Sequence, residues 1–255
     1  MAEAARKKKS KVVVALDPAA DRRDPEQFAT KVIDAVADDA CAVKINFHLL
    51  LPLSLKEIAK VTKKAHSHGL LCIADIKLND ISDTNEVALV HLARMGFDAV
   101  IANPFMGANT LVLLAKKARS LGMGVIALVY MSHPDAQDGY GLHAYGGDMM
   151  YRIFLDRAIK AKVDGIVVGA TQTDILKEIS RKRKELRILL PVYSPGVGAQ
   201  GGGARQAVQS GSDYLIIGRS IVRAKDPRVA ARQFKLAAVN GDDDNDGGSS
   251  GLVPS

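Results

Sequence analysis

Short apolar runs alternate with longer amphipathic segments along this chain, from residue 11 to residue 237. The amphipathic segments, such as 55–68 and 109–121, repeat their apolar positions with the period of a helix. This alternation is typical of repeated βα units around a parallel sheet. The apolar runs predict eight strands: Lys11–Asp17 (KVVVALD), Ala42–Asn46 (AVKIN), Leu70–Lys77 (LLCIADIK), Ala99–Asn103 (AVIAN), Gly124–Tyr130 (GVIALVY), Gly165–Gly169 (GIVVG), Ile188–Val192 (ILLPV) and Tyr214–Gly218 (YLIIG).

Eight such units predict an α/β fold of one domain, a single (β/α)8 TIM barrel. An open doubly wound sheet has fewer strands and a Gly-rich turn after the first, whereas here the first strand runs into Asp17-Pro18, which disfavours a dinucleotide site. A length of 255 residues with 47% hydrophobic residues suits one barrel. The expected organisation is a basic disordered arm at 1–10, the catalytic barrel at 11–238, and a disordered acidic, Gly/Ser-rich tail or cloning remnant at 239–255.

The net charge of +7 raises the question of a nucleic-acid partner, but the clustered basic residues all lie in one N-terminal run, RKKKSK. With no Trp and no aromatic RNA-binding motif, no nucleic acid is expected. No apolar run reaches the roughly 18 residues of a membrane helix, and no signal-peptide core is present, so a cytoplasmic protein without a membrane partner is predicted. Cys41 and Cys72 form no CxxC pair, which favours reduced thiols.

The richest cluster of charge follows the third predicted strand, in ADIKLNDISDT (residues 74–84). Side chains alternate along a strand, so Asp75 and Lys77 share a face, and the apolar run before them places that face inside the barrel. Asp80 follows in the loop, and Lys44 lies near the end of the neighbouring strand. Active-site groups of such barrels lie at these strand ends. A converging Lys-Asp-Lys-Asp array is predicted, with salt bridges on a solvated rim as the structural alternative.

Two glycine-containing segments follow the last two predicted strands, SPGVGAQGGG at 194–203 and IIGRS at 216–220. Loops after strands seven and eight commonly hold a phosphate, because Gly lets backbone N–H groups approach it and a cation such as Arg219 completes the grip. A phosphate monoester is the expected ligand. A flexible Gly-rich connector, the structural alternative, accounts neither for Gln200 nor for the Gly218-Arg219 pair one unit later.

Four motifs, VKIN, DIKLNDI, MSHP and PGVGAQGG, occur in this order at these barrel positions. With them the chain resembles the orotidine 5'-phosphate decarboxylase family, especially its compact archaeal-type members, from about Val12 to Phe234. The resemblance implies decarboxylation of orotidine 5'-phosphate to uridine 5'-phosphate, the last step of de novo UMP synthesis, with no metal and no organic cofactor. It also implies a homodimer whose active sites are shared across the interface. The pyrimidine substrate follows from the resemblance alone.

The resemblance implies roles for individual residues. Lys77 matches the proton donor to C6 of the pyrimidine, and Asp75 matches the group beside the substrate carboxylate. The catalytic set that it implies is Lys44, Asp75, Lys77 and Asp80.

A second set matches positions that contact the substrate. Some of these positions contact the amide edge of the pyrimidine, bind the phosphate or begin a mobile loop. Others, like Asp80, are positions that the family supplies to the partner's site. These substrate-binding residues are Asp17, Ile81, Thr84 (the last two from the partner), Ser132 (amide edge), Pro195 (loop start), Gln200, Gly218 and Arg219 (phosphate).

Two other functions remain open. Metal-dependent relatives that act on sugar phosphates, such as 3-keto-gulonate-phosphate decarboxylase and hexulose-phosphate synthase, share the DxKxxD strand, but they carry an acidic metal ligand where this chain has Lys44, and they lack PGVGAQGG. A non-catalytic phosphate-binding barrel would need to have lost the charged array, which is intact here. The histidines show no ligand-like clustering with acids, so no metal site is predicted, and His133 is interpreted as a turn or packing residue.

Overall fold

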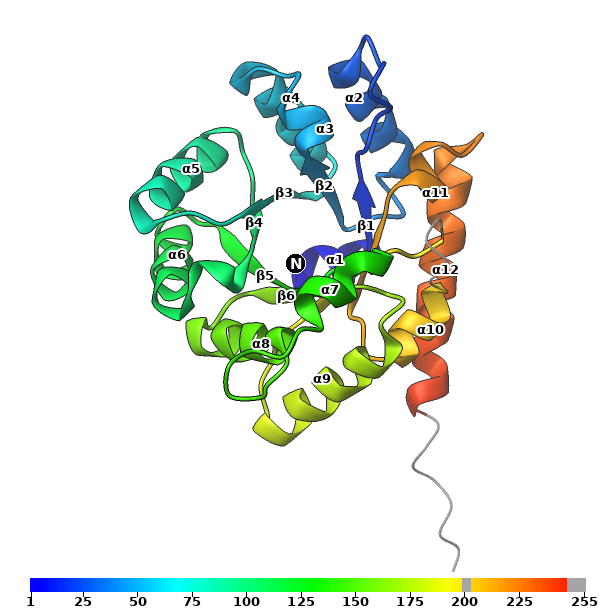
Figure 1. Cartoon of the computed structure of the whole chain (residues 1–255). Helices are drawn as coiled ribbons and strands as arrows, with labels where there is room; N and C mark the ends of the chain where they lie inside the picture. The colour runs from blue at the N-terminus through cyan, green and yellow to red at the C-terminus, as the bar shows by residue number, and fades with distance from the viewer. Residues whose placement is uncertain (199–202, 247–255) are drawn as a thin grey trace, which may run out of the picture.

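The computed structural model describes residues 1–198 and 203–246. Its eight parallel strands form a closed barrel in chain order, in which each strand pairs with the next and β8 pairs with β1. Figure 1 shows the helices arranged as a ring outside the strands. The predicted (β/α)8 barrel is therefore confirmed. The strands are β1 Val12–Ala15, β2 Ala42–Asn46, β3 Leu71–Leu78, β4 Ala99–Ala102, β5 Gly124–Tyr130, β6 Gly165–Val168, β7 Val192–Pro195 and β8 Tyr214–Ile217.

Helices of varied length connect the strands. The longer ones that form the outer ring are α2 Pro25–Val36, α4 Leu55–Ser67, α5 Ser82–Arg94, α6 Ala108–Ser120, α8 Met150–Ala161, α9 Thr173–Leu186 and α12 Pro227–Asp246. Shorter ones are α1 Ala2–Lys8, α3 Phe47–Leu50, η1 Pro104–Met106, η2 Pro134–Ala136, α7 Gln137–Tyr140, α10 Ala204–Gln209 and α11 Arg219–Val222. Among the described residues, no helix combines the length and the apolar character needed to cross a membrane.

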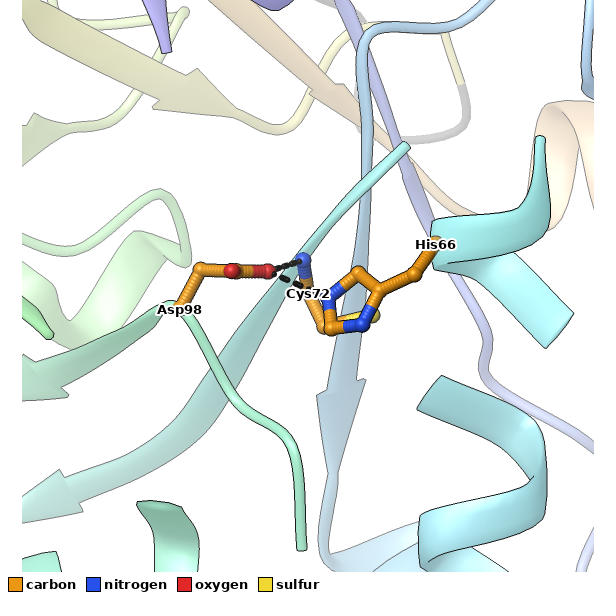
Figure 2. A group of neighbouring side chains, drawn as sticks. All are labelled: His66, Cys72 and Asp98. Carbon is orange, nitrogen blue, oxygen red and sulfur yellow. Dashed lines mark hydrogen bonds and ion pairs between the residues drawn. The ribbon is translucent and has the colours of Figure 1, made fainter. Parts of the chain in front are cut away.

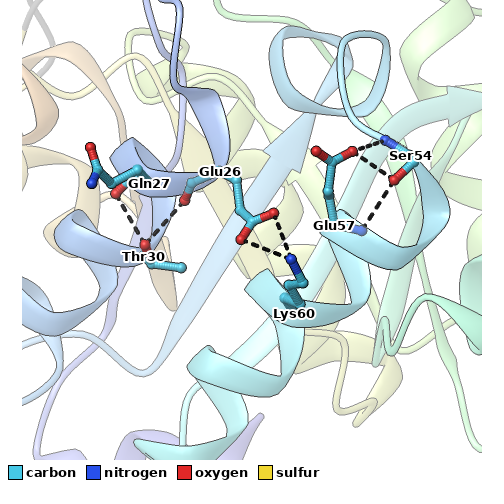
Figure 3. Close-up of polar contacts among 6 residues, drawn as sticks. All are labelled: Glu26, Gln27, Thr30, Ser54, Glu57 and Lys60. Atoms are coloured by element: carbon cyan, nitrogen blue, oxygen red, sulfur yellow. Dashed lines mark hydrogen bonds and ion pairs between the residues drawn. The ribbon is translucent and has the colours of Figure 1, made fainter.

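Polar contacts fix the start of α4 and join it to α2. At the start of α4, Ser54 and Glu57 form a capping box, in which the Ser54 hydroxyl accepts the Glu57 N–H and the Glu57 carboxylate accepts the Ser54 N–H. On α2, Glu26 reaches across to Lys60 of α4, with 3.4 Å between Oε2 and Nζ (Figure 3). These contacts fix neighbouring helices beside β2 and β3, the strands that carry the charged array.

The boundary of β7 differs from the prediction. The sequence pattern placed this strand at Ile188–Val192, whereas it runs from Val192 to Pro195. Leu189 is almost fully exposed, and although Leu190 is buried, the continuous run of buried positions begins at Val192. Because Pro has no N–H to donate to a ladder, it is disfavoured in the middle of such a strand. The apolar run before Pro191 is therefore the connection into β7.

Helices form in parts of both terminal segments that the sequence predicted to be disordered. Residues 1–10 were predicted as a disordered arm, but helix α1 forms there and packs Met1, Ala4 and Ala5 against the cluster inside the barrel. In Figure 1 it lies across the centre of the ring. The exposed Arg6 and Lys7 thus lie on a helix whose small apolar side chains pack against the barrel interior. At the other end, α12 continues to Asp246, past the predicted boundary at 238.

Candidate active site

The charged array is built at the carboxyl ends of β2 and β3. Lys44 pairs in register with Ile73, and Asp75 lies two residues further along β3, so both side chains enter the barrel interior. The β3–β4 pairing then shifts between Ala74 and Leu78. Within this irregular stretch Lys77 has φ 48°, in the left-handed region that a non-Gly residue adopts at an energetic cost. The strained backbone conformation therefore belongs to Lys77, one of the predicted catalytic residues.

A linear ion network joins three of the predicted catalytic residues. Lys44 Nζ lies 2.6 Å from Asp75 Oδ2, and Lys77 Nζ lies 2.8 Å from Asp75 Oδ1. The side chains of Lys44 and Asp75 are less than a tenth exposed, whereas that of Lys77 is 40% exposed and reaches the solvent-accessible cavity. Burial raises the pKa of Asp75, but the two ammonium groups lower it by more, so this pKa lies below its ordinary value. Asp75 is therefore a fixed carboxylate at neutral pH.

Asp80, the fourth predicted catalytic residue, lies outside this network. It is exposed, and its Oδ1 accepts the N–H of Ile81 at 2.7 Å. Ile81 is 69% exposed and Thr84 is also exposed. None of the three lines the cavities that hold the network within its own chain.

A second group of predicted residues forms a cavity of about 150 Å³ beside the network, at the ends of β1 and β8. Asp17, Gly218 and Arg219 line it together with the backbone at Gly196. Asp17 Oδ1 is buried and has no hydrogen-bond partner among the described residues. A Cβ on Gly218 would lie 3.0 Å from Asp17 Oδ2, closer than an ordinary van der Waals contact, so the absence of a side chain here leaves room for the carboxylate. Arg219 is exposed and forms no ion pair within the described part of the chain. The cavity thus offers an acceptor and a cation without partners.

The two cavities adjoin. The one beside the network, about 270 Å³, includes Asp75 and Lys77, and it shares Ser132 and Pro195 with the smaller one. The structure therefore brings together eight of the predicted residues: Asp17, Lys44, Asp75, Lys77, Ser132, Pro195, Gly218 and Arg219. Gln200 lies outside the described residues.

His133, interpreted from the sequence as a turn or packing residue, also lines the larger cavity. Its place directly after Ser132 at the end of β5 was the signal that could have indicated this. The segment beyond it forms η2 and α7 and then a small hairpin with a bridge between His143 and Met149.

Two histidines do contact acids, contrary to the sequence-based reasoning: His68 Nε2 lies 2.7 Å from Asp34 Oδ1, and His66 Nε2 lies 2.9 Å from Asp98 Oδ2. Figure 2 shows His66, Cys72 and Asp98 together. Asp98 Oδ2 also accepts the Cys72 N–H at 2.7 Å, and burial raises the pKa of the Cys72 thiol well above its ordinary value. Because Asp98 binds both His66 and the Cys72 N–H, this cluster links α4 with the sheet.

Comparison with known proteins identifies the family to which this barrel belongs. Residues 10–234 match the model of the Orotidine 5'-phosphate decarboxylase / HUMPS family. The chain belongs to this family. The match spans the whole barrel, from Ser10, two residues before β1, into α12.

Curated members of the family are similar along most of their length. A Methanosarcina barkeri orotidine 5'-phosphate decarboxylase is 35% identical over 231 residues, which cover 91% of this chain and 95% of that protein. One from Pyrococcus abyssi is 33% identical over 209 residues, 82% of this chain and 92% of that protein. The crystal structure of the Methanocaldococcus jannaschii enzyme complexed with the inhibitor BMP is 30% identical with a TM-score of 0.76, and the match covers 90% of this chain and 98% of that one. The predicted archaeal-type resemblance is confirmed.

Proposed function

We propose that this chain decarboxylates orotidine 5'-phosphate to uridine 5'-phosphate, with no metal and no organic cofactor. The observation that carries the proposal is the Lys77 ammonium, held 2.8 Å from a buried carboxylate at the edge of a cavity that adjoins the Arg219 pocket. A nucleotide laid across both cavities would have its pyrimidine near Lys77 and its phosphate near Arg219.

In this mechanism the bond between C6 and the carboxylate carbon breaks, CO2 leaves, and the electron pair stays on C6. Little delocalisation is available to that carbanion, so a fixed positive charge must stabilise it. Lys77 supplies the charge and then donates its proton to C6, which gives the C–H bond of the product. Asp75, which Lys44 keeps ionised, stands near the departing carboxylate, and like-charge repulsion there raises the energy of the bound substrate as a secondary effect.

The rest of the nucleotide supplies binding energy remote from the reacting carbon. Arg219 and the backbone around Gly218 bind the phosphate, with Gln200 as a further donor, and the unpartnered Asp17 Oδ1 accepts a hydrogen bond from a ribose hydroxyl. Ser132 contacts the amide edge of the pyrimidine, and Pro195 begins the loop that closes over the phosphate. Because this energy is used to complete the site, phosphate contacts affect turnover as well as affinity.

The family also contains metal-dependent enzymes of sugar phosphates, and Lys44 argues against that function here. In this chain the second strand ends with a buried lysine paired to Asp75, at the position where those relatives carry an acidic ligand. An ammonium group cannot bind a cation, and its charge repels one.

The decisive assay uses purified protein stripped with EDTA and incubated with orotidine 5'-phosphate. Loss of orotate absorbance with release of CO2, unchanged when Mg²⁺ is added back, is the expected result. Turnover that needs Mg²⁺ and occurs only on sugar phosphates would establish the metal-dependent alternative instead.

We also propose a homodimer in which Asp80, Ile81 and Thr84 enter the partner's site. These exposed side chains do not line the cavities of their own chain. Large apolar side chains lie exposed after three consecutive strands: Phe47 and Leu51 after β2, Ile81 after β3 and Phe105 after β4. Such an exposed apolar region suits a self-complementary interface. The unpaired, buried Cys41 and Cys72 suit a reducing compartment, and we place the enzyme in the cytoplasm.

Mixing two inactive variants tests the shared site. Random exchange of Lys77→Ala and Asp80→Asn chains makes half of the dimers heterodimers, each with one intact site of two, so about a quarter of the wild-type activity should return. Native mass spectrometry first confirms that heterodimers form. Heterodimers without restored activity would refute the claim that Asp80 serves the partner's pocket.

A further inference from the structure

Asn85 is a buried polar residue in the first turns of α5, five residues after Asp80. Its side chain is 1% exposed. The amide Nδ2 donates to the main-chain carbonyl of Asp80 at 2.7 Å and lies 3.6 Å from Met106 Sδ. Its Oδ1 is buried and has no hydrogen-bond partner among the described residues.

An unpartnered buried amide oxygen costs stability. The other buried side chains of this helix, Leu89 and Leu92, are apolar, and an apolar side chain at position 85 would avoid that cost. Packing alone therefore does not explain an asparagine here. What distinguishes Asn85 from leucine at this position is its N–H donor to Asp80.

That donor acts on an otherwise exposed turn. Asn79, Asp80 and Ile81 are all exposed, so few packing contacts fix the turn. Two bonds hold Asp80 from within its own chain: its Oδ1 accepts the Ile81 N–H at 2.7 Å, and its carbonyl accepts the Asn85 amide. Together they restrict the orientation of the exposed Asp80 side chain.

We propose that Asn85 is a positioning residue for the decarboxylation, which holds the Asp80 turn in the orientation that delivers the Asp80 carboxylate to the shared site. This rests on the proposed role of Asp80. A catalytic carboxylate displaced by about 1 Å loses about 10-fold to 100-fold in rate, even when the fold is intact. Stability and activity therefore depend on Asn85 in opposite directions.

The test is a double-mutant cycle between Asn85→Leu and Asp80→Asn. In the wild-type background Asn85→Leu should lower kcat by about 10-fold or more with KM little changed, because the phosphate pocket is untouched. In the Asp80→Asn background it should lower kcat by less than about 3-fold, since the group that it positions is already lost. Urea unfolding should show Asn85→Leu to be at least as stable as the wild type.

Asn109→Leu, the same substitution at an exposed position in the first turn of α6, is the matched control and should leave kcat unchanged. If the leucine variant does not fold, Asn85→Ala also removes the donor and should give the same coupling.

The outcomes separate this inference from the function on which it rests. If Asp80→Asn impairs kcat and the two losses multiply, Asn85 does not act through Asp80 and the inference is wrong. Loss of stability and of kcat together in both backgrounds would show a merely structural role and would also overturn it. If Asp80→Asn alone keeps the wild-type kcat, the proposed role of Asp80 fails first, and the inference fails with it.

Discussion

The two ends of this barrel differ in whether their polar side chains have hydrogen-bond or ion-pair partners within the described residues. At the amino ends of the strands, Asp98, Asp164 and Asp213 each stand directly before an even-numbered strand, and their carboxylates accept the backbone N–H of Cys72, Val125 and Val192 on the preceding strand at 2.7, 2.9 and 2.7 Å. At the carboxyl ends, Asp17 Oδ1 has no partner, Arg219 has no ion pair within the described residues, and Lys77 has a left-handed backbone.

The difference separates stability from function within one fold. Polar groups whose hydrogen bonds are complete fix the strands, and helix α1 packs against the apolar cluster inside this end of the barrel. Groups whose bonding is incomplete carry a cost that a ligand can remove when it binds. Substitutions at the two ends should therefore affect different measurements.

The largest effect is expected at the carboxyl end, from Lys77→Ala. Removal of the charge that the carbanion needs should lower kcat on the order of 10³-fold. Stability should change little, because Asp75 keeps Lys44 as a partner. Steady-state kinetics together with urea unfolding measure both. A variant that unfolds easily would show that Lys77 serves the fold, contrary to the comparison.

Arg219→Ala should have a smaller effect, at the same end. Loss of a charge-assisted bond to phosphate should lower kcat/KM about 10-fold to 100-fold, and part of the loss should fall on kcat. Arg223→Ala, which removes the same charge at an exposed position just past α11, is the control and should retain the wild-type kcat/KM. Equal rates on orotidine and its phosphate would contradict the phosphate role of this pocket.

At the amino end the expected effect is on stability alone. Asp98→Ala leaves the buried Cys72 N–H without its acceptor and should lower the free energy of unfolding by about 1–3 kcal/mol. Asp98→Asn keeps an acceptor oxygen and should cost less. Urea titration gives the stability, and kcat should stay at the wild-type value in both variants. A fall in kcat without a fall in stability would show that the two ends are coupled.

The sequence predicted most of the fold because strands and helices leave their apolar periodicity in short, continuous segments of the chain. Each of the eight predicted strands overlaps an observed one, and α4 and α6 end within a residue of their expected bounds. The pattern missed features that depend on tertiary contacts. Helix α1 is stabilised by Met1, Ala4 and Ala5 against the barrel interior, and nothing in a lysine-rich run announces that contact. The shift in β7 follows from Pro191, which the apolar run concealed.

The sequence predicted those site residues whose positions follow from the carboxyl ends of the strands. Alternation along β3 placed Asp75 and Lys77 on one face, and the structure confirms that both line one cavity. The left-handed backbone of Lys77 could not be predicted, because only glycine signals such a conformation from sequence. Asp98, Asp164 and Asp213 at the opposite end also follow a pattern in the sequence, which the strand prediction did not use. The segments GFDA, KVDG and GSDY each place an aspartate directly before a strand.

The burial of both cysteines makes this protein convenient for site-selective chemistry. Cys41 and Cys72, the two thiols of the chain, have no solvent exposure, and burial raises the pKa of Cys41 to about 12. Reagents that attack thiolates will therefore spare them while the barrel is folded. Tyr145 is fully exposed in the hairpin that follows α7. A Tyr145→Cys chain would carry one fluorescent label there and report, in solution, on movement of that hairpin as nucleotide enters and leaves.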